Sequence, residues 1–284
     1  MNYRPIWKLS FLLLFFLVMQ PVNAQQQDSL SILQPSFFEN LKQDSKTALG
    51  GVKAVYLSPL SWQKKDLLLA GSAALGTGIL YSVDEETSDY FRNRKDDVPE
   101  ILSDIGSFGS PETLFALDGA VYLSGLLLKN EKLRHTGLLL VTSATASGLL
   151  LTFTKVLVGR ARPLKGEGNH EFRPFSFKDD HYRSFPSGHA LFAFSTAYAV
   201  GKQFKNPFVK AGIYSLGMIG PASRLWEGEH WLTDVAVSVV LGVAVVEYVD
   251  HYLTQKRRST LPPAKKISWS LNLGPNSLGL TGTF

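Results

Sequence analysis

Six stretches of apolar and small residues dominate the pattern of the chain between residues 66 and 255. None shows the strict alternation of apolar and polar positions that marks a half-buried strand, and each is long enough for a helix. The pattern therefore predicts an all-α fold, a six-helix bundle. The predicted helices are Leu67–Val83, Thr113–Leu128, Thr136–Val158, His189–Phe204, Pro207–Ser223 and Trp231–Leu253.

Two polar segments interrupt this pattern. Asp84–Pro111 carries many charges and separates the first two predicted helices. Leu164–Phe185 contains glycine, proline, histidine and charged residues, and separates the third helix from the fourth. We expect Leu164–Phe185 to be a loop at the entrance to a site.

The first 24 residues have the pattern of a secretory signal peptide. Arg4 and Lys8 precede the apolar run Ser10–Met19, and the small residue Ala24 closes the segment. The alternative is an uncleaved anchor, although the run is shorter than the ~20 residues that a membrane span needs. Residues 25–65 follow as a polar segment with an amphipathic stretch near Phe37–Leu49.

The C-terminal residues differ from the helical part. We expect residues 66–255 to form one domain, and residues 256–284 to be a basic linker and a tail. Apolar and small residues alternate around Gly274-Pro275-Asn276, which predicts a short β-hairpin.

Composition narrows the chemistry. Cysteine is absent, which excludes disulfides, thiolate nucleophiles and cysteine-ligated metals, and we see no metal-binding motif. The net charge of +5 falls by two without Arg4 and Lys8, so we expect no nucleic-acid partner. A mean hydropathy of +0.03 lies between that of a soluble domain and that of a polytopic membrane protein.

Candidate chemistry first appears at the end of the third predicted helix. Lys155 and Arg162 are seven residues apart, so a continuous helix would place both cations on one face until Pro163 stops it. Two cations there favour a bound polyanion, although a solvated basic helix end has the same pattern.

A second cluster, Pro186-Ser187-Gly188-His189, comes where the fourth predicted helix begins. Free backbone N–H groups at a helix start bind anions, Gly188 permits close approach, and Ser187 adds a hydroxyl donor. His189 could donate a proton to a leaving oxygen there. A simple helix cap would use the same residue types.

The third cluster contains Arg224, His230 and Asp234. Four residues separate His230 from Asp234, so on a helix the carboxylate could fix the imidazole tautomer and leave one nitrogen free as nucleophile or base. Arg224 offers a fork for phosphate oxygens. A purely structural His–Asp pair is the alternative. Together, however, the three clusters form a complete set for phosphoryl transfer.

In order and internal spacing these clusters resemble the three signature motifs of the type 2 phosphatidic acid phosphatase / vanadium haloperoxidase superfamily. The matching residues are Lys155…Arg162-Pro163, Pro186-Ser187-Gly188-His189 and Ser223-Arg224…His230…Asp234. The resemblance covers about residues 67–253, and it implies an all-α bundle with its active site in the motif-bearing loops.

The same resemblance implies the roles of individual residues. His230 would be the nucleophile that forms a phosphohistidine, Asp234 would orient it, and His189 would act as general acid and then base. The implied enzyme is a phosphatase that needs no metal or other cofactor. Its phosphate-binding residues would be Lys155, Arg162, Ser187, Gly188 and Arg224.

We expect the substrate to be a phosphomonoester or diphosphate, and a lipid phosphate in particular. Two enzymatic alternatives are a soluble periplasmic non-specific acid phosphatase and a haloperoxidase that holds vanadate in the same pocket. A third alternative is a non-catalytic envelope protein that retains the fold.

The relation to the membrane is open from the residues alone. The uncharged run Thr136–Thr154 and the cations at the end opposite the motifs favour six spans with the site outside. A cleaved signal would leave residue 25 outside the membrane, and three spans would then bring Lys155 to the cytoplasmic side. Asp118 and Lys210 also interrupt predicted helices. We expect an exported integral membrane enzyme of a bacterial-type envelope with a periplasmic site, and a soluble periplasmic protein is the alternative.

Overall fold

The computed structural model describes residues 36–177, 179–260, 268–274 and 277–283. The predicted signal peptide and the tip of the predicted hairpin lie outside these residues. The α-helices are α2 (Phe37–Leu57), α3 (Lys64–Tyr81), α4 (Asp84–Arg92), α5 (Glu100–Phe108), α6 (Pro111–Leu127), α7 (Glu131–Val158), α8 (Gly188–Gly201), α9 (Pro207–Trp226) and α10 (Leu232–Thr260). Two strands, β1 (Ser268–Gly274) and β2 (Ser277–Thr283), follow.

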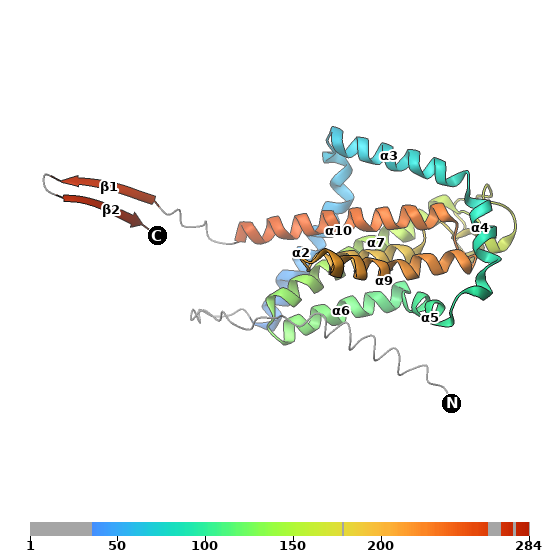
Figure 1. Cartoon of the computed structure of the whole chain (residues 1–284), viewed down its shortest axis with the longest axis horizontal. Coiled ribbons are helices and arrows are strands. Elements are labelled where there is room, and N and C mark those ends of the chain that lie inside the picture. The colour runs from blue at the N-terminus through green and yellow to red at the C-terminus, as the bar shows by residue number, and fades with distance from the viewer. Residues whose placement is uncertain (1–35, 178, 261–267, 275–276, 284) are drawn as a thin grey trace, which may run out of the picture.

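The all-α prediction is confirmed, and the six predicted helices correspond to α3 and α6–α10. Helices α6, α7, α9 and α10 run side by side along the long axis of the molecule (Figure 1). The largest cluster of buried side chains lies between α6, α7, α8 and α10, and it includes Leu139, Val246 and Val249, which are almost fully buried.

Helices α6 and α7 approach closely because glycines lie between them. A Cβ on Gly125 would lie 2.3 Å from the backbone nitrogen of Arg134, and one on Gly137 would lie 2.3 Å from the Cα of Tyr122. Small residues let two backbones pack at this distance, where any side chain would force them apart.

Helices also form in segments that we expected to be polar connections. The predicted amphipathic stretch extends to a full helix, α2, whose start is stabilised by a capping box between Ser36 and Glu39. The charged insertion contains α4 and α5, and α4 has three acidic residues in its first turn, where the helix dipole favours negative charge.

The end of α7 differs from the prediction. The helix ends at Val158 because Gly159 adopts a left-handed conformation with φ of 58°. A Cβ on Gly159 would lie 1.9 Å from the carbonyl oxygen of Arg173, so only glycine fits. Arg162 therefore lies in the following loop, and the prediction that it shares a helix face with Lys155 is wrong. Pro163 starts a 3₁₀ turn instead of stopping a helix.

The helices of the third cluster also begin and end elsewhere. Helix α9 continues past Ser223 to Trp226, so Arg224 lies in its last turn. Helix α10 begins at Leu232, which places His230 before the helix and corrects the prediction that His230 and Asp234 share one helical face.

The predicted hairpin is present in the C-terminal tail. Strand β1 pairs with β2 in antiparallel register, with Leu271 opposite Leu280. Figure 1 draws this pair beyond the C-terminal end of α10.

Among the residues that the structure describes, two helices, α7 and the Leu232–Ser259 part of α10, are long and apolar enough to cross a membrane. Helices α3 and α4 meet at a 59° bend and would count as a third span if taken together.

Candidate active site

The three motif clusters meet at one end of the bundle, where α7 and α9 end and α8 and α10 begin. Hydrogen bonds join the clusters to one another. Trp231 Nε1 donates to the Ala161 carbonyl at 2.8 Å, and the backbone N–H of Ser187 donates to Ser238 Oγ at 2.8 Å. Lys155 Nζ donates to the carbonyl of Arg183 in the loop that leads to α8. Helix ends that are far apart in sequence thus form one site.

The start of α8, where the first backbone N–H groups have no carbonyl partner within the helix, lies at this site. Ser187 is the N-cap, fully buried, and its Oγ accepts from the backbone N–H of Ala190 at 3.4 Å. Gly188 follows in a tight space, since a Cβ there would lie 3.1 Å from Leu151 Cδ2. His189, in the first turn, is only partly buried.

His189 lies in a positive environment. Burial, and then the charge of Arg224, lower the pKa of its imidazole to about 4. The side chain is therefore neutral near pH 7 when the site holds no anion. A phosphate group would offset the cationic field and favour the protonated form.

His230 is almost completely buried, with 4% of its surface exposed. Its Nδ1 lies 3.7 Å from Asp234 Oδ2, which is longer than a hydrogen bond, and it has no hydrogen-bond partner among the described residues. Catalytic hydrogen bonds often tighten only when substrate binds. Burial lowers the pKa of His230 to about 3, against the opposing effect of Asp234, so the ring is neutral and retains a lone pair.

Donors hold the carboxylate of Asp234 from several sides. Oδ2 accepts from the backbone N–H of Trp231 at 3.0 Å and from Ser184 Oγ. Oδ1 accepts from Arg160 Nη1 at 2.7 Å. The side chain is fully buried, so these contacts fix the direction of the oxygen that faces His230.

Two of the predicted phosphate-binding cations are paired with acids from the turn between α9 and α10. Arg162 forms an ion pair with Glu229. Arg224 Nη2 lies 2.9 Å from Glu227 Oε2. Each glutamate lies against a guanidinium group that the resemblance assigns to phosphate binding, and neither glutamate was predicted from the sequence.

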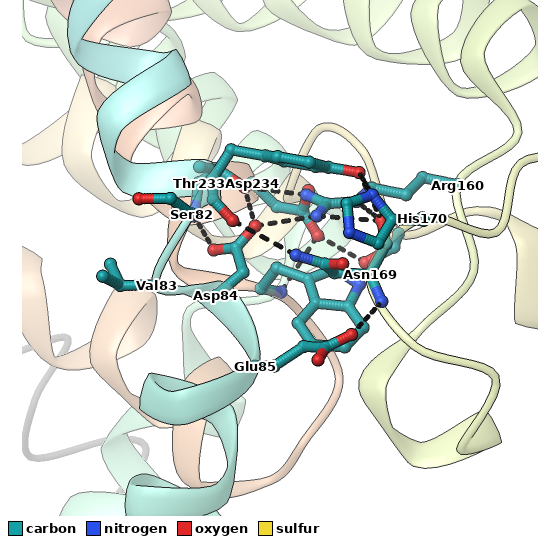
Figure 2. Close-up of polar contacts among 12 residues, drawn as sticks. Ser82, Val83, Asp84, Glu85, Arg160, Asn169, His170, Thr233 and Asp234 are labelled. Atoms are coloured by element: carbon teal, nitrogen blue, oxygen red, sulfur yellow. Dashed lines mark hydrogen bonds and ion pairs between the residues drawn. The ribbon is translucent and has the colours of Figure 1, made fainter.

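A buried polar network behind Asp234 was also missed (Figure 2). Arg160 lies at its centre and forms ion pairs with Asp84 and Asp234, each at 2.7 Å. Asp84 Oδ1 accepts from the backbone N–H of Thr233 at 2.9 Å. Arg160 lies between the other two cations of the first motif, but its position in the sequence gives no sign of a role different from theirs. Asp84 is one of many acids in a charged insertion, and only the fold reveals its partner.

Within the described ranges, no three His, Asp or Glu side chains are placed to hold a metal ion. The cations and the α8 start are the groups at this site that can balance an anion.

Several known proteins are similar to this chain in sequence. The sequence profile of the PAP2 superfamily matches residues 136–258, which contain all three motifs. A lipid A 1-phosphatase of Rhizobium etli is 28% identical over 66% of this chain and 82% of its own length. A lipid A 1-phosphatase of Rhizobium johnstonii is 34% identical over 37% of this chain and 43% of its own.

Among solved structures, the crystal structure of Aquifex aeolicus LpxE aligns with 58% of this chain and 94% of its own, with a TM-score of 0.41 and 22% identity. This chain is similar to the PAP2 superfamily over residues 136–258, and the three motifs in that region meet at one end of an all-α bundle.

Proposed function

We propose that this protein is a metal-independent phosphatase that hydrolyses lipid phosphates through a phosphohistidine. The observation that carries the proposal is His230, a buried neutral imidazole beside a fixed carboxylate, at the end of the bundle where the motif cations gather. A neutral imidazole attacks phosphorus, and the surrounding cations stabilise the charge of the transition state.

The first step forms the phosphoenzyme. The free Nε2 of His230 attacks phosphorus, the bond from phosphorus to the leaving oxygen breaks, and His189 gives that oxygen its proton. Asp234 accepts the Nδ1 proton of His230 in a hydrogen bond and stabilises the positive charge on the ring. The oxygens of the transferred group contact Lys155, Arg162, Arg224 and the start of α8.

The second step regenerates the enzyme. His189, now neutral, takes a proton from water, and the water oxygen attacks phosphorus. The P–N bond to His230 breaks and inorganic phosphate leaves. One histidine thus serves as acid and then as base.

The apolar surface supports a lipid substrate and a membrane location. Helix α3 buries none of its residues, and Leu68, Leu69 and Ile79 are 63%, 70% and 71% exposed. Such a helix is costly in water and stable in lipid. We propose an integral membrane enzyme of the bacterial envelope with its site on the periplasmic face. Because its relatives include lipid A 1-phosphatases, a glycolipid phosphate is the first substrate to test.

The test of the chemistry is phosphate release from lipid phosphates by purified variants. We expect His230→Ala to abolish turnover and His189→Ala to fail on poor leaving groups. The matched control is His251→Ala, an exposed histidine in the C-terminal part of α10. Full activity in His230→Ala would refute the assignment.

The membrane location has a separate test. We expect the protein to stay in the membrane pellet after an alkaline carbonate wash, together with a known integral protein. Its release into the supernatant would point to the soluble periplasmic alternative.

A further inference from the structure

We propose that Arg160, braced by Asp84, is the positioning residue that holds Asp234 in its productive orientation. This inference rests on the proposed function, because it concerns the orientation of the nucleophile His230. Neither Arg160 nor Asp84 is one of the motif residues to which the resemblance gives a role.

The donors of Arg160 are fully used inside the protein (Figure 2). A guanidinium has five N–H donors. Nη1 donates to Thr233 Oγ1 and Asp234 Oδ1, each at 2.7 Å. Nη2 donates to Asp84 Oδ2 at 2.7 Å and to the Asn169 carbonyl at 3.3 Å, and Nε donates to that carbonyl at 3.3 Å. No donor remains for a substrate phosphate, so Arg160 acts through Asp234.

Burial makes the Arg160 bridge rigid. Arg160 is 2% exposed, and its guanidinium lies among three aromatic rings. Its Cζ is 4.8 Å from the ring of Tyr81, 5.3 Å from that of Trp231 and 5.8 Å from that of Phe172. These rings and the five hydrogen bonds together hold the planar guanidinium in one orientation.

The charges explain why the bridge needs both acids. Asp234 is fully buried, and an anion there is stable only with a partner. Arg160 supplies the positive charge, and Asp84, also fully buried, holds its other side. Asp84 lies at the bend between α3 and α4, so the bridge ties this bend to the start of α10.

The geometry also explains why lysine cannot replace Arg160. One ammonium group cannot span two carboxylates that a planar fork contacts on separate nitrogens. Arg160→Lys keeps the charge and loses the bridge, which makes it the informative variant.

The test compares Arg160→Lys with Arg134→Lys in the full-length protein. Arg134 is a partly buried arginine near the start of α7, far from the site, and its Nε lies 2.9 Å from Asp44 Oδ2. We expect Arg160→Lys to lower kcat roughly 10- to 100-fold with KM unchanged, as for other groups that orient a catalytic side chain. Arg134→Lys should leave kcat per folded molecule unchanged.

A double-mutant cycle separates action through Asp234 from a general structural effect. In an Asp234→Asn background, residue 234 is neutral and Arg160 has no carboxylate to orient there. Arg160→Lys should therefore lower kcat little further. Effects that multiply independently would overturn the proposal. A raised KM of the kind expected for Arg162→Lys would overturn it too, since it would indicate phosphate contact.

Two measurements cover the remaining outcomes. If Arg160→Lys does not fold, Asp84→Asn with Asp44→Asn as its control tests the same bridge, and equal kcat in the pair would refute the proposal. If His230→Ala keeps full activity, the proposed function itself fails. Loss of activity in His230→Ala together with equal kcat in the two arginine variants would refute the positioning role alone.

Discussion

At the scale of single residues, burial decides the protonation of both histidines. His230 is almost completely buried, with Asp234 Oδ2 at 3.7 Å from its Nδ1, and His189 lies near the charge of Arg224. The order of residues in the motifs predicts that both imidazoles take part in catalysis. The motif order does not predict that both imidazoles are neutral near pH 7. Their pKa values depend on how far the folded chain excludes water from each ring.

The first prediction concerns acid pH. Protonation removes the lone pair of His230, and its pKa is lowered to about 3, so the nucleophile should survive to lower pH than an ordinary histidine would. We expect single-turnover phosphorylation of His230 to persist as the pH falls from 7 to ~4, where an ordinary histidine would lose it near its usual pKa of about 6.5. Recovery of activity at pH 7 controls for unfolding, and an acid limb near 6.5 would contradict the prediction.

The second prediction concerns Glu229, whose carboxylate pairs with Arg162. Removing the negative charge in Glu229→Gln frees the guanidinium for phosphate. We expect competitive inhibition by inorganic phosphate to tighten about twofold to fivefold, the equivalent of roughly 0.5–1 kcal/mol for a partly exposed ion pair.

Glu131→Gln is the matched control for Glu229→Gln. Glu131 pairs with Arg134 at 2.6 Å near the start of α7, far from the site, and its loss should leave the inhibition constant unchanged. Weaker inhibition in Glu229→Gln would show that the glutamate positions Arg162 for phosphate and does not compete with it.

At the scale of elements, α6 packs closely on α7, the helix that carries Lys155 of the first motif. Glycines set the distance between these two helices. Gly137 lies against the backbone of Tyr122, whose hydroxyl donates to Asp44 at 2.9 Å and so ties α2 to the same contact. The predicted apolar stretches contain these glycines, but their pattern does not indicate which of them lies in a helix contact.

The third prediction tests this packing. Gly137→Ala should lower stability by about 1–3 kcal/mol, because its Cβ would overlap the backbone of Tyr122 and two helices would have to separate. Gly119→Ala, on α6 with open space around its Cβ position, should be neutral or slightly stabilising. Thermal unfolding in detergent measures both, and equal melting temperatures would contradict the packing argument.

At the scale of the whole molecule, a group of lysines lies at the end of the helices opposite the site. The cations Lys129, Lys132 and Lys205 stand at helix ends away from the motifs. The bend between α3 and α4 and the helix α5 stand at the site end (Figure 1). These lysines are the reason for the proposed orientation, in which the site faces outward and the lysine end faces the cytoplasm.

The fourth prediction tests that orientation with single cysteines, which the natural chain lacks. Asp96→Cys lies in the exposed segment between α4 and α5, and Lys205→Cys lies between α8 and α9 at the other end. In cells with a permeable outer membrane, a membrane-impermeant maleimide should label Asp96→Cys directly and Lys205→Cys only after lysis. The reverse result would place the site in the cytoplasm, and labelling of both would favour a soluble protein.

Sequence patterns predicted the existence of elements better than their ends. The six apolar stretches became six helices because each stretch is long, apolar and free of strand alternation. The end of α7 was predicted wrongly, because the left-handed turn at Gly159 depends on the nearby carbonyl of Arg173. Charged segments such as α4 were not predicted as helices, because the partners of Asp84 come from the other half of the chain.

By itself the sequence determined the all-α class, the approximate helices and the three motifs, because apolar periodicity and fixed residue spacing are local properties. Only the tertiary structure decided how these parts act together. The fold places Arg160 between Asp84 and Asp234, pairs Arg162 with Glu229, and surrounds His230 with buried groups. The physical reason is that desolvation, ion pairing and helix contact depend on distances in space between residues that are far apart along the chain.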